Sequence, residues 1–225
     1  PTGDYDGFLH FERGGIGDTY RAGAGCHASW VRKRGRRMGD RWLTAVDCET
    51  MARADQVVVN SHMVRSEAID LYGIPEERLH LVRNVVDSER FKPGEKTETP
   101  SVVFPGGGVL RKGLKVAVDA MRRIPDAELI VMGDVSPAMQ RWTQHTGVRI
   151  RFMGRVADPE RLLAGAHAMV LPTMYDPSSN AVLEAMACGV PVVTTSHDGS
   201  AELLPHRWMA ISDPLDAEAC AEVLV

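Results

Sequence analysis

The chain has 225 residues, a formal net charge of −4 and 44% hydrophobic residues. This length can bury the core of one large domain or of two modest ones. The slightly acidic balance excludes an overall positive field for nucleic acid, and no apolar run approaches the ~20 residues that a membrane-spanning helix needs. The first residues do not resemble a secretory leader. Four widely spaced cysteines without a C-x-x-C pair predict reduced thiols in the cytoplasm and no bound metal.

The first ninety residues have the pattern of part of an α/β domain. Short apolar runs and helical patterns alternate there, with strands expected at 19–22, 55–60 and 79–82 and helices at 27–53 and 62–72. Residues 91–100 are polar and contain two prolines and a glycine, which is typical of a linker. We therefore expect a first domain over 1–90, too short for a complete α/β domain, and a linker over 91–100.

From residue 101 onward the alternation is regular. Strands are expected at 101–104, 128–132, 148–152, 168–171, 191–195 and 208–211, and helices at 110–123, 137–146, 159–166, 180–188 and 200–204. The strand segments are continuously apolar, as expected for strands that are covered on both faces. This pattern predicts a Rossmann-like parallel sheet, flanked by helices, over residues 101–225.

A glycine-rich turn, Pro105-Gly-Gly-Gly-Val-Leu-Arg-Lys-Gly113, joins the first of these strands to a helix. Gly107 and Gly108 allow the backbone to approach a ligand closely. Arg111 and Lys112 can offset the charge of a diphosphate. The segment is neither a Walker loop nor a dinucleotide-binding fingerprint, because the required spacings are absent. The alternative is a tight turn with two solvated basic side chains.

Two carboxylates, Asp176 and Glu184, lie eight residues apart across the start of the helix expected at 180–188. The helix N-terminus offers unpaired N–H groups and a positive dipole end to an anion. The residues expected around this anion site are Ser178, Ser179, Asn180 and Ala181. Carboxylates beside it can accept hydrogen bonds from hydroxyl groups, so the motif fits a nucleotide-sugar. Alternatively, Asp176 starts a turn before Pro177, and Glu184 is a surface residue of the helix.

Two further segments follow strands at the same expected edge of the sheet. Gly154 and Arg155 end the third strand of this domain and can border a flat base, since ligands of such sheets bind outside the carboxyl ends of the strands. A plain strand-to-loop turn is the alternative. Residues 197–202 follow the fifth strand and can complete the pocket.

Basic residues gather in the first part of the chain between Arg32 and Arg41. Five arginines and one lysine stand there against the single acid Asp40, with Trp30, Val31 and Met38 interleaved. This segment can touch an anionic membrane surface or an anionic acceptor. The alternative is the solvated face of a long helix. No aromatic platform for nucleic acid is evident.

Together these residues resemble the family-four retaining glycosyltransferases of GT-B architecture. That family is marked by Glu-x7-Glu followed by an E-A-M-A-C-G-x-P-V-V run, and residues 184–193 match this run closely. Asp176 stands in place of the first Glu, and the Lys-Gly pair of the family is present at residues 112–113. The usual Arg five residues ahead of that Lys is replaced by Gly107, so Arg111 is expected to take its role.

A narrower likeness, over about residues 18 to 205, is to the lipopolysaccharide-core hexosyltransferases, in which the same Asp-for-Glu exchange is common. It is carried by three segments: 20–27, 111–113 and 175–180. Relative to that family the opening glycine-rich loop, the acceptor-side groups and the last crossing helix are missing. Because the chain also lacks an initiator methionine, we expect it to be a fragment. The resemblance implies a GT-B enzyme with a donor domain and part of a second Rossmann-like domain.

The resemblance also implies roles for the residues. Arg111 and Lys112 would neutralise the donor diphosphate, Glu184 would hold the ribose hydroxyls and Asp176 the hydroxyls of the transferred sugar. Backbone N–H groups at 179–181 would bind phosphate and sugar, and Gly154 and Arg155 would lie near the base. Two cations and a helix N-terminus can replace a metal ion, so no cofactor and no metal are expected.

The expected activity is metal-independent transfer of a hexose, with retention, from a nucleotide diphosphate sugar to a hydroxyl of a glycan or lipid-linked acceptor in cell-envelope polysaccharide synthesis. The narrower likeness makes UDP-glucose the first candidate donor. The expected location is the cytoplasm, with peripheral contact at the inner face of the membrane through the segment from Arg32 to Arg41, and no nucleic acid is bound. Two alternatives are a nucleotide-sugar epimerase of GT-B fold and a non-catalytic nucleotide-sugar-binding remnant.

Overall fold

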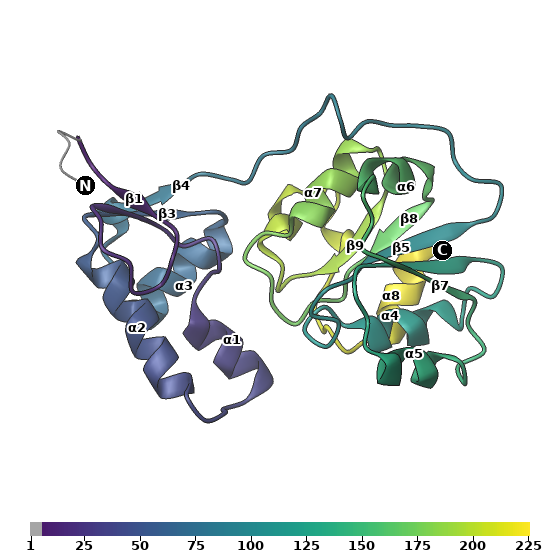
Figure 1. The fold of residues 1–225 in the computed structure, drawn as a ribbon, viewed down its shortest axis with the longest axis horizontal. Helices are drawn as coiled ribbons and strands as arrows, with labels where there is room; N and C mark the ends of the chain where they lie inside the picture. Colours follow the sequence, from purple (N-terminus) through teal and green to yellow (C-terminus); the bar gives the residue numbers. More distant parts are fainter. Residues whose placement is uncertain (1–5) are drawn as a thin grey trace. The chain divides into compact units, whose positions relative to one another are not determined.

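The computed structural model describes residues 6–225, which form two compact units. The first unit contains the described residues up to Asn84 together with Asp176–Ser178, and the second contains residues 85–175 and 179–225. Each unit has its own parallel sheet (Figure 1). The α/β class with parallel sheets is therefore confirmed, whereas the expected domain boundaries at residues 90 and 100 remain a prediction.

The first unit is a four-stranded sheet with three helices. In order across the sheet, the strands are β1 (Leu9–His10), β2 (Thr19–Arg21), β3 (Gln56–Val59) and β4 (Leu79–Leu81), and the helices are α1 (His27–Arg34), α2 (Asp40–Arg53) and α3 (His62–Tyr72). A 3-10 turn, η1 (Glu76–Arg78), precedes β4. The Ser61 side chain accepts a hydrogen bond from the Val64 N–H (3.2 Å) and so caps α3. Strand β1 did not follow from the sequence pattern, because it is only two residues long.

The single helix expected over 27–53 is wrong, because the chain forms α1 and α2 with a break at residues 35–39. Gly35 and Gly39 have φ angles of +84° and +90°, outside the helical region. Gly35 ends α1 and Gly39 precedes the first residue of α2. Two glycines four residues apart thus separate two helices, although the run of basic residues continues from one helix to the next.

The second unit has a six-stranded parallel sheet. Its strands are β5 (Ser101–Pro105), β6 (Glu128–Met132), β7 (Ile150–Gly154), β8 (Ala168–Val170), β9 (Val192–Thr195) and β10 (Ala210–Ile211), in the order β10-β9-β8-β5-β6-β7. Val103 of β5 is paired with Ile130 on one side and with Met169 on the other. All five residues of β5 are buried, as the continuously apolar strand segments predicted.

Helices cover both faces of this sheet. They are α4 (Leu114–Met121), α5 (Pro137–Thr143), α6 (Pro159–Gly165), α7 (Asn180–Ala187) and α8 (Ala217–Leu224), and the 3-10 turns are η2 (Gly199–Leu203) and η3 (Arg207–Met209). Figure 1 shows α6 and α7 on one side of the strands and α4, α5 and α8 on the other. Two separate apolar clusters fit this arrangement, one around Leu114 and Met121 of α4 and one around Leu163 of α6 and Val182 of α7.

Two expected helices of the second unit differ from the observed elements, and one observed helix was not expected. The helix expected from residue 110 begins only at Leu114, because residues 106–113 form a glycine-rich turn. The helix expected at 200–204 is the 3-10 turn η2. Helix α8 was not expected, although its Cys220 and Ala221 are buried against the core cluster of α4.

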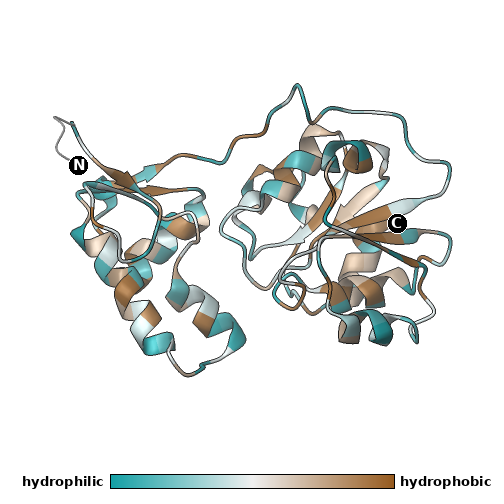
Figure 2. Cartoon of the chain, in the orientation of Figure 1, coloured by the Kyte–Doolittle hydropathy of each residue, from teal (hydrophilic) through white to brown (hydrophobic). Residues whose placement is uncertain are grey.

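Hydropathy follows this architecture. Figure 2 shows apolar strands in the middle of the second unit and mixed colours on the helices around them. Within residues 6–225, no helix combines the length and the apolar character needed to cross a bilayer. None of the four cysteines, all of which lie within the described residues, forms a disulfide, and three of them are buried.

Candidate functional site

The second sheet has a topological switch point between β5 and β8. From β5 the chain moves outward to β6 and β7, whereas from β8 it moves outward in the opposite direction to β9 and β10. Such a reversal leaves a crevice outside the carboxyl ends of the two central strands, where ligands of open α/β sheets bind. The glycine-rich turn follows β5 and the segment leading to α7 follows β8, so both predicted motifs start at this point.

Glycines bring the backbone of the turn close to its neighbours. A Cβ atom on Gly106 would lie 1.7 Å from the Met132 carbonyl oxygen, and one on Gly113 would lie 2.1 Å from the Pro172 carbonyl oxygen. Gly107 and Gly108 have φ angles of +81° and +65° and no backbone or side-chain atom closer than 3.9 Å to an added Cβ. The first pair therefore packs the turn against β6 and the end of β8, and the second pair shapes its open part.

Arg111 connects the turn after β5 to the segment after β8. Its guanidinium Nη1 donates a hydrogen bond to the Tyr175 carbonyl. Its own carbonyl accepts from the Met174 N–H (2.8 Å) and from the Thr173 hydroxyl (3.2 Å). Because Tyr175 directly precedes Asp176, Arg111 is attached to the start of the predicted carboxylate motif.

The side chain of Lys112 folds back onto the same turn. Its Nζ donates a hydrogen bond to the Gly106 carbonyl (3.3 Å), and its side chain is half-buried. Its charge also acts on Glu184, as described below. The structure thus brings Lys112 and Glu184 into one electrostatic environment, although they are 72 positions apart in the sequence.

Helix α7 positions Glu184. Val182, Leu183 and Ala185 are buried in the core, and this holds the adjacent Glu184 half-buried at the surface of the unit. Burial raises the pKa of Glu184, while the charges of Arg90 and Lys112 act in the opposite direction. A carboxylate that is partly removed from water and faces cations is suited to accept hydrogen bonds from hydroxyl groups. The end of α7 is as expected, with Gly189 at φ +68° after the last turn.

Asp198 is a residue that the sequence reasoning missed. It is only 1% exposed, and its carboxylate accepts hydrogen bonds from the Ser179 N–H (3.2 Å), the Thr194 hydroxyl (3.0 Å) and the Ser200 N–H and hydroxyl (2.9 and 2.6 Å). Ser179 is the N-cap residue of α7, but its side chain makes no capping bond. Asp198 therefore anchors the backbone in front of α7 from the next strand of the sheet. The segment 197–202 was noted in the sequence, but nothing there indicated the contact of Asp198 with the distant Ser179.

The remaining predicted residues fall in two groups. Asp176, Ser178 and Ser179 are buried, whereas Asn180 is exposed and Ala181 is intermediate. Asp176 and Ser178 belong by their contacts to the first unit, and Ser179 to the second. Asp176 is connected to Arg111 through the neighbouring Tyr175, whose carbonyl accepts the hydrogen bond from Arg111.

Gly154 and Arg155 lie farther along the carboxyl edge. Gly154 ends β7, and its carbonyl accepts a hydrogen bond from the Gly133 N–H at the end of β6 (2.6 Å). Strand β6 separates β7 from β5, so Gly154 is two strands away from the switch point. The Arg155 side chain is 89% exposed and pairs with Asp134 at 3.0 Å. Arg155 is thus a solvent-facing residue at the rim of this edge.

Arg90 is a second residue that the sequence reasoning did not single out. It forms an ion pair with Glu160 at 2.9 Å. Its positive charge also partly offsets the effect of burial, which raises the pKa of Glu184.

Within residues 6–225, no three His, Cys, Asp or Glu side chains gather as metal ligands would.

The fold and the edge of the second sheet together define an α/β protein with a Rossmann-like sheet, with two cationic side chains in the turn at its switch point. Residues 99–225 match the family model described as "Glycosyl transferases group 1", and residues 18–90 match that of "Glycosyltransferase Family 4". The chain belongs to the group 1 glycosyltransferases, and its fold is that of GT-B enzymes.

Individual relatives agree with this assignment. The lipopolysaccharide core biosynthesis glycosyltransferase LpsE of Rhizobium meliloti is 32% identical over 119 residues, which cover 51% of this chain and 35% of that protein. The crystal structure of WaaG, a glycosyltransferase involved in lipopolysaccharide biosynthesis, superposes with a TM-score of 0.84 at 20% identity and covers 98% of this chain and 68% of its own. Anabaena HepE in complex with UDP-glucose has a TM-score of 0.76 at 19% identity, covering 92% and 61%.

The chain spans about half the length of several curated relatives, 48% in two cases. The activity, substrates and partners of the whole protein are therefore the subject of the proposal that follows.

Proposed function

We propose that this chain carries the donor site of a retaining, metal-independent hexosyltransferase, which moves a hexose from a nucleotide diphosphate sugar to a hydroxyl of a glycan or lipid-linked acceptor of the cell envelope. The observation that carries the proposal is the junction of the loops after β5 and β8: Arg111 joins them, and Lys112 acts on the half-buried Glu184. At a switch point, cations suit the diphosphate of a nucleotide-sugar, and a carboxylate suits its hydroxyl groups.

Each residue has a role in the proposal. Arg111 and Lys112 offset the charge that develops on the leaving diphosphate, and Glu184 accepts hydrogen bonds from the ribose hydroxyls. Asp176 holds hydroxyls of the transferred sugar. The N-terminal turn of α7 receives phosphate, since the positive end of a helix dipole attracts an anion. The residues proposed to line the rest of the donor site are Gly107, Gly108, Gly154, Arg155, Ser178, Ser179, Asn180 and Ala181.

UDP-glucose is the first donor to test. HepE, which shares the fold, is described in complex with UDP-glucose. LpsE and WaaG are described as enzymes of lipopolysaccharide biosynthesis, which supports an acceptor of that kind. The two cations and the helix N-terminus provide the charge stabilisation that a divalent ion supplies in other transferases.

Calorimetric titration of UDP-glucose into the full chain tests the donor site. Glu184→Gln keeps the shape of the side chain but removes its charge, and we expect at least about tenfold weaker binding, because hydrogen bonds to a charged acceptor contribute roughly 1.5–3 kcal/mol. Glu128→Gln is the matched control: Glu128 is also half-buried and near a cation, since it pairs with Arg151 at 2.8 Å, but it lies at the amino end of β6. Equal affinity of the wild type and Glu184→Gln would remove Glu184 from the donor site.

Product analysis tests the chemistry. With donor and a lipopolysaccharide-core acceptor, nuclear magnetic resonance should show a glycoside with the anomeric configuration of the donor, and formation of this product should persist in chelator. Loss of Lys112 should lower the rate by about 10²–10³, as for removal of one donor of an oxyanion hole. An epimerised nucleotide-sugar from donor alone would establish an epimerase instead. Donor binding without any turnover would establish a binding protein.

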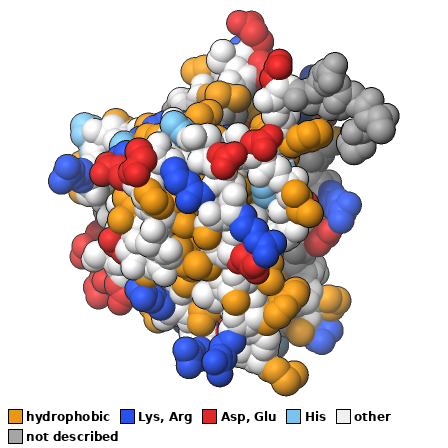
Figure 3. All heavy atoms as spheres, turned by 90° about the vertical axis from the view of Figure 1, so that its left-hand side faces the viewer, with side chains coloured by type: hydrophobic (Ala, Val, Ile, Leu, Met, Phe, Trp, Pro, Cys, Tyr) orange, Lys and Arg blue, Asp and Glu red, His pale blue; other side chains and the backbone are white. Residues whose placement is uncertain are grey.

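Peripheral contact with the inner face of the cytoplasmic membrane is part of the same proposal. The side chains proposed to contact the membrane are the exposed basic ones between Arg32 and Arg41. Figure 3 shows acidic and basic side chains interspersed over the face that it presents, so the contact would be local rather than a broad charged surface. Flotation with phosphatidylglycerol vesicles should be lost at about 1 M salt, where charges are screened within about 3 Å.

A further inference from the structure

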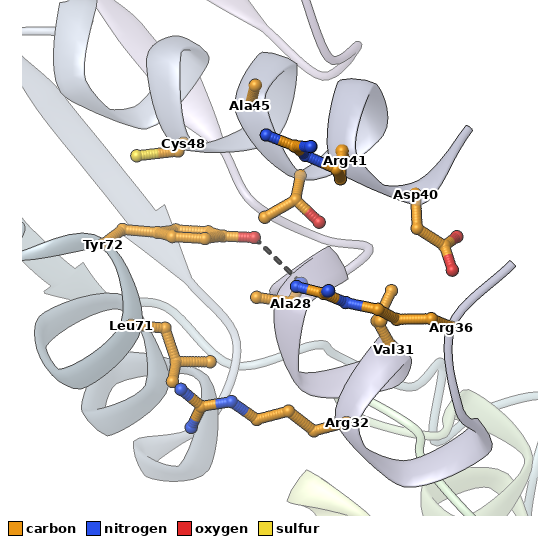
Figure 4. A pocket seen from close by; sticks show the side chains of 11 residues that line it. Ala28, Val31, Arg32, Arg36, Asp40, Arg41, Ala45, Cys48, Leu71 and Tyr72 are labelled. Atoms are coloured by element: carbon orange, nitrogen blue, oxygen red, sulfur yellow. Dashed lines mark hydrogen bonds between the residues drawn. The ribbon is translucent and has the colours of Figure 1, made fainter. Parts of the chain in front are cut away.

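A cavity of about 450 Å³ lies within the first unit, between α1, the first half of α2 and the end of α3. Three arginines line it: Arg32 from α1, Arg36 from the connection between the helices, and Arg41 from the first turn of α2. Figure 4 shows the Arg36 side chain reaching toward the part of the cavity where the Tyr72 hydroxyl lies, with Arg41 and Arg32 on either side. Leu71, Val31, Ala28 and Ala45 provide apolar wall.

The three guanidinium groups are not paired with any carboxylate of the described residues. Among residues 6–225, none of them makes a side-chain hydrogen bond or an ion pair. Asp40 also lines the cavity, but its carboxylate is already engaged by Arg34 Nη2 (2.5 Å), the Arg37 N–H (2.5 Å) and His27 Nε2 (3.3 Å). Three like charges around one hollow therefore repel one another, and an anion in the cavity would relieve this repulsion.

Helix stability explains only part of this arrangement. Arg32 lies in the last turn of α1, where a cation offsets the negative end of the helix. Arg41 lies in the first turn of α2, at the positive end, where a cation is unfavourable. Arg36 belongs to neither helix. Two of the three arginines thus have no stabilising role in the helices that they flank.

We propose that this cavity binds a phosphate monoester. Arginine forks match phosphate oxygens in charge and geometry, and the positive end of α2 adds to their attraction. A phosphate group alone would fill only part of a cavity whose volume is typical of small-molecule sites, so the apolar wall receives the organic group that the phosphate carries. A sugar phosphate and a phosphatidic acid headgroup share this chemistry. The inference goes beyond the proposed donor site and uses none of its residues, but it shares Arg32, Arg36 and Arg41 with the proposed membrane contact.

Titration of glucose 6-phosphate into the full chain at low salt, with glucose as the uncharged reference, tests the site. We expect Arg36→Gln and Arg41→Gln each to weaken binding at least about tenfold, as for loss of a hydrogen bond between charged groups. Arg37→Gln is the matched control, because this exposed side chain belongs to the same segment but does not line the cavity. It should change affinity less than about twofold, the range of an ordinary surface charge. UDP-glucose affinity, measured on the same variants, should stay unchanged.

A second arm uses phosphatidylcholine vesicles with and without about one fifth phosphatidic acid. The site is supported if glucose 6-phosphate binding, or the increase in vesicle binding that phosphatidic acid causes, depends on Arg36 and Arg41 but not on Arg37. The probe that shows this dependence identifies the source of the phosphate. Equal losses in all three variants would show diffuse attraction to surface charge and overturn the proposal. Absence of binding to both probes would also overturn it, whether or not the protein binds UDP-glucose.

Discussion

Single buried polar groups fix the local geometry of this protein, and Asp198 is the clearest case. Its carboxylate collects four hydrogen bonds from three residues that belong to three different segments. Replacing Asp198 by Ala leaves these donors without an acceptor in a site that is 1% exposed. We expect the free energy of unfolding to fall by about 2–4 kcal/mol, because an unsatisfied buried donor costs roughly 1–3 kcal/mol.

Urea denaturation measures this change, and Asp126→Ala is the reference, since Asp126 is exposed and its side chain makes no hydrogen bond or ion pair within residues 6–225. Asp198→Asn keeps the size of the side chain and should retain part of the stability. If Asp198 positions the start of α7, Asp198→Asn should also raise KM for the donor more than it lowers kcat. An Asp198→Ala variant as stable as the reference would contradict the role of this carboxylate.

Asp40 gives a prediction that depends on pH. The hydrogen bond from Arg34, together with those from the Arg37 N–H and His27, lowers the pKa of Asp40 from 3.8 to about 2. A depressed carboxylate pKa contributes stability that is present above the unfolded pKa and is lost as pH falls through the folded one. The wild type should therefore be more stable than Asp40→Asn near neutral pH, and the difference should shrink as pH falls from about 4 toward about 2.

Urea denaturation of both proteins from about pH 6 to about pH 3 measures this trend. Arg34→Gln should remove most of the same pH-dependent part, because Arg34 is the main cause of the lowered pKa. A stability difference between wild type and Asp40→Asn that stays constant over this range would contradict the prediction.

The sequence could indicate some of these residues and not others. Glu184 could be singled out because its neighbours on a short helix are apolar, and in the structure its side chain is half-buried. Asp198 could not be selected, because its distant partner Ser179 meets it only once β8 and β9 are paired. Arg90 was missed for the same reason, since its partner Glu160 lies 70 positions away.

At the scale of elements, positive-φ glycines decide where helices begin and end. Hydrophobic periodicity could not separate α1 from α2 or place the start of α4, because it does not report on the left-handed backbone conformation of Gly35, Gly39 and Gly113. The long segments that periodicity describes well, such as β6 and α3, have the bounds that the sequence predicted. Elements of two or three residues are too short for hydrophobic periodicity to define their bounds.

Gly113 tests the turn between β5 and α4. Its φ angle is +79°, and a Cβ would lie 2.1 Å from the Pro172 carbonyl oxygen, which belongs to the backbone at the end of β8. Gly147 has a similar φ of +76° but no atom within 4 Å of an added Cβ. Gly147→Ala should cost only the conformational strain of about 1–2 kcal/mol, whereas Gly113→Ala should cost clearly more, because the two backbone segments must also separate.

Thermal and urea unfolding of both variants give the comparison. Gly113→Ala should in addition weaken UDP-glucose binding, because it moves Arg111 and Lys112 away from the end of β8. Equal destabilisation by the two substitutions would show that the close approach to Pro172 contributes nothing to stability.

At the scale of the whole chain, the hydrophobic cores respect the division into two units. The cluster around Tyr20, Met51 and Val57 draws only on residues between 20 and 81. The two clusters of the second unit draw only on residues between 86 and 224. The sequence indicated the second unit well because its parallel sheet consists of continuously apolar segments. The exact point of division was less accessible, since Phe91 in the polar segment 91–100 is buried against the second unit's core.

Because no apolar cluster of the described residues combines the two units, residues 85–225 should fold as a separate protein. The fragment should show a single cooperative urea transition and the near-ultraviolet circular dichroism of a packed core, reported by Trp142 beside α4. The matched variant Leu114→Ala should lower its stability by about 2–5 kcal/mol, because Leu114 is fully buried in one of its clusters. A fragment without a cooperative transition would show that the second unit needs the first to complete its core.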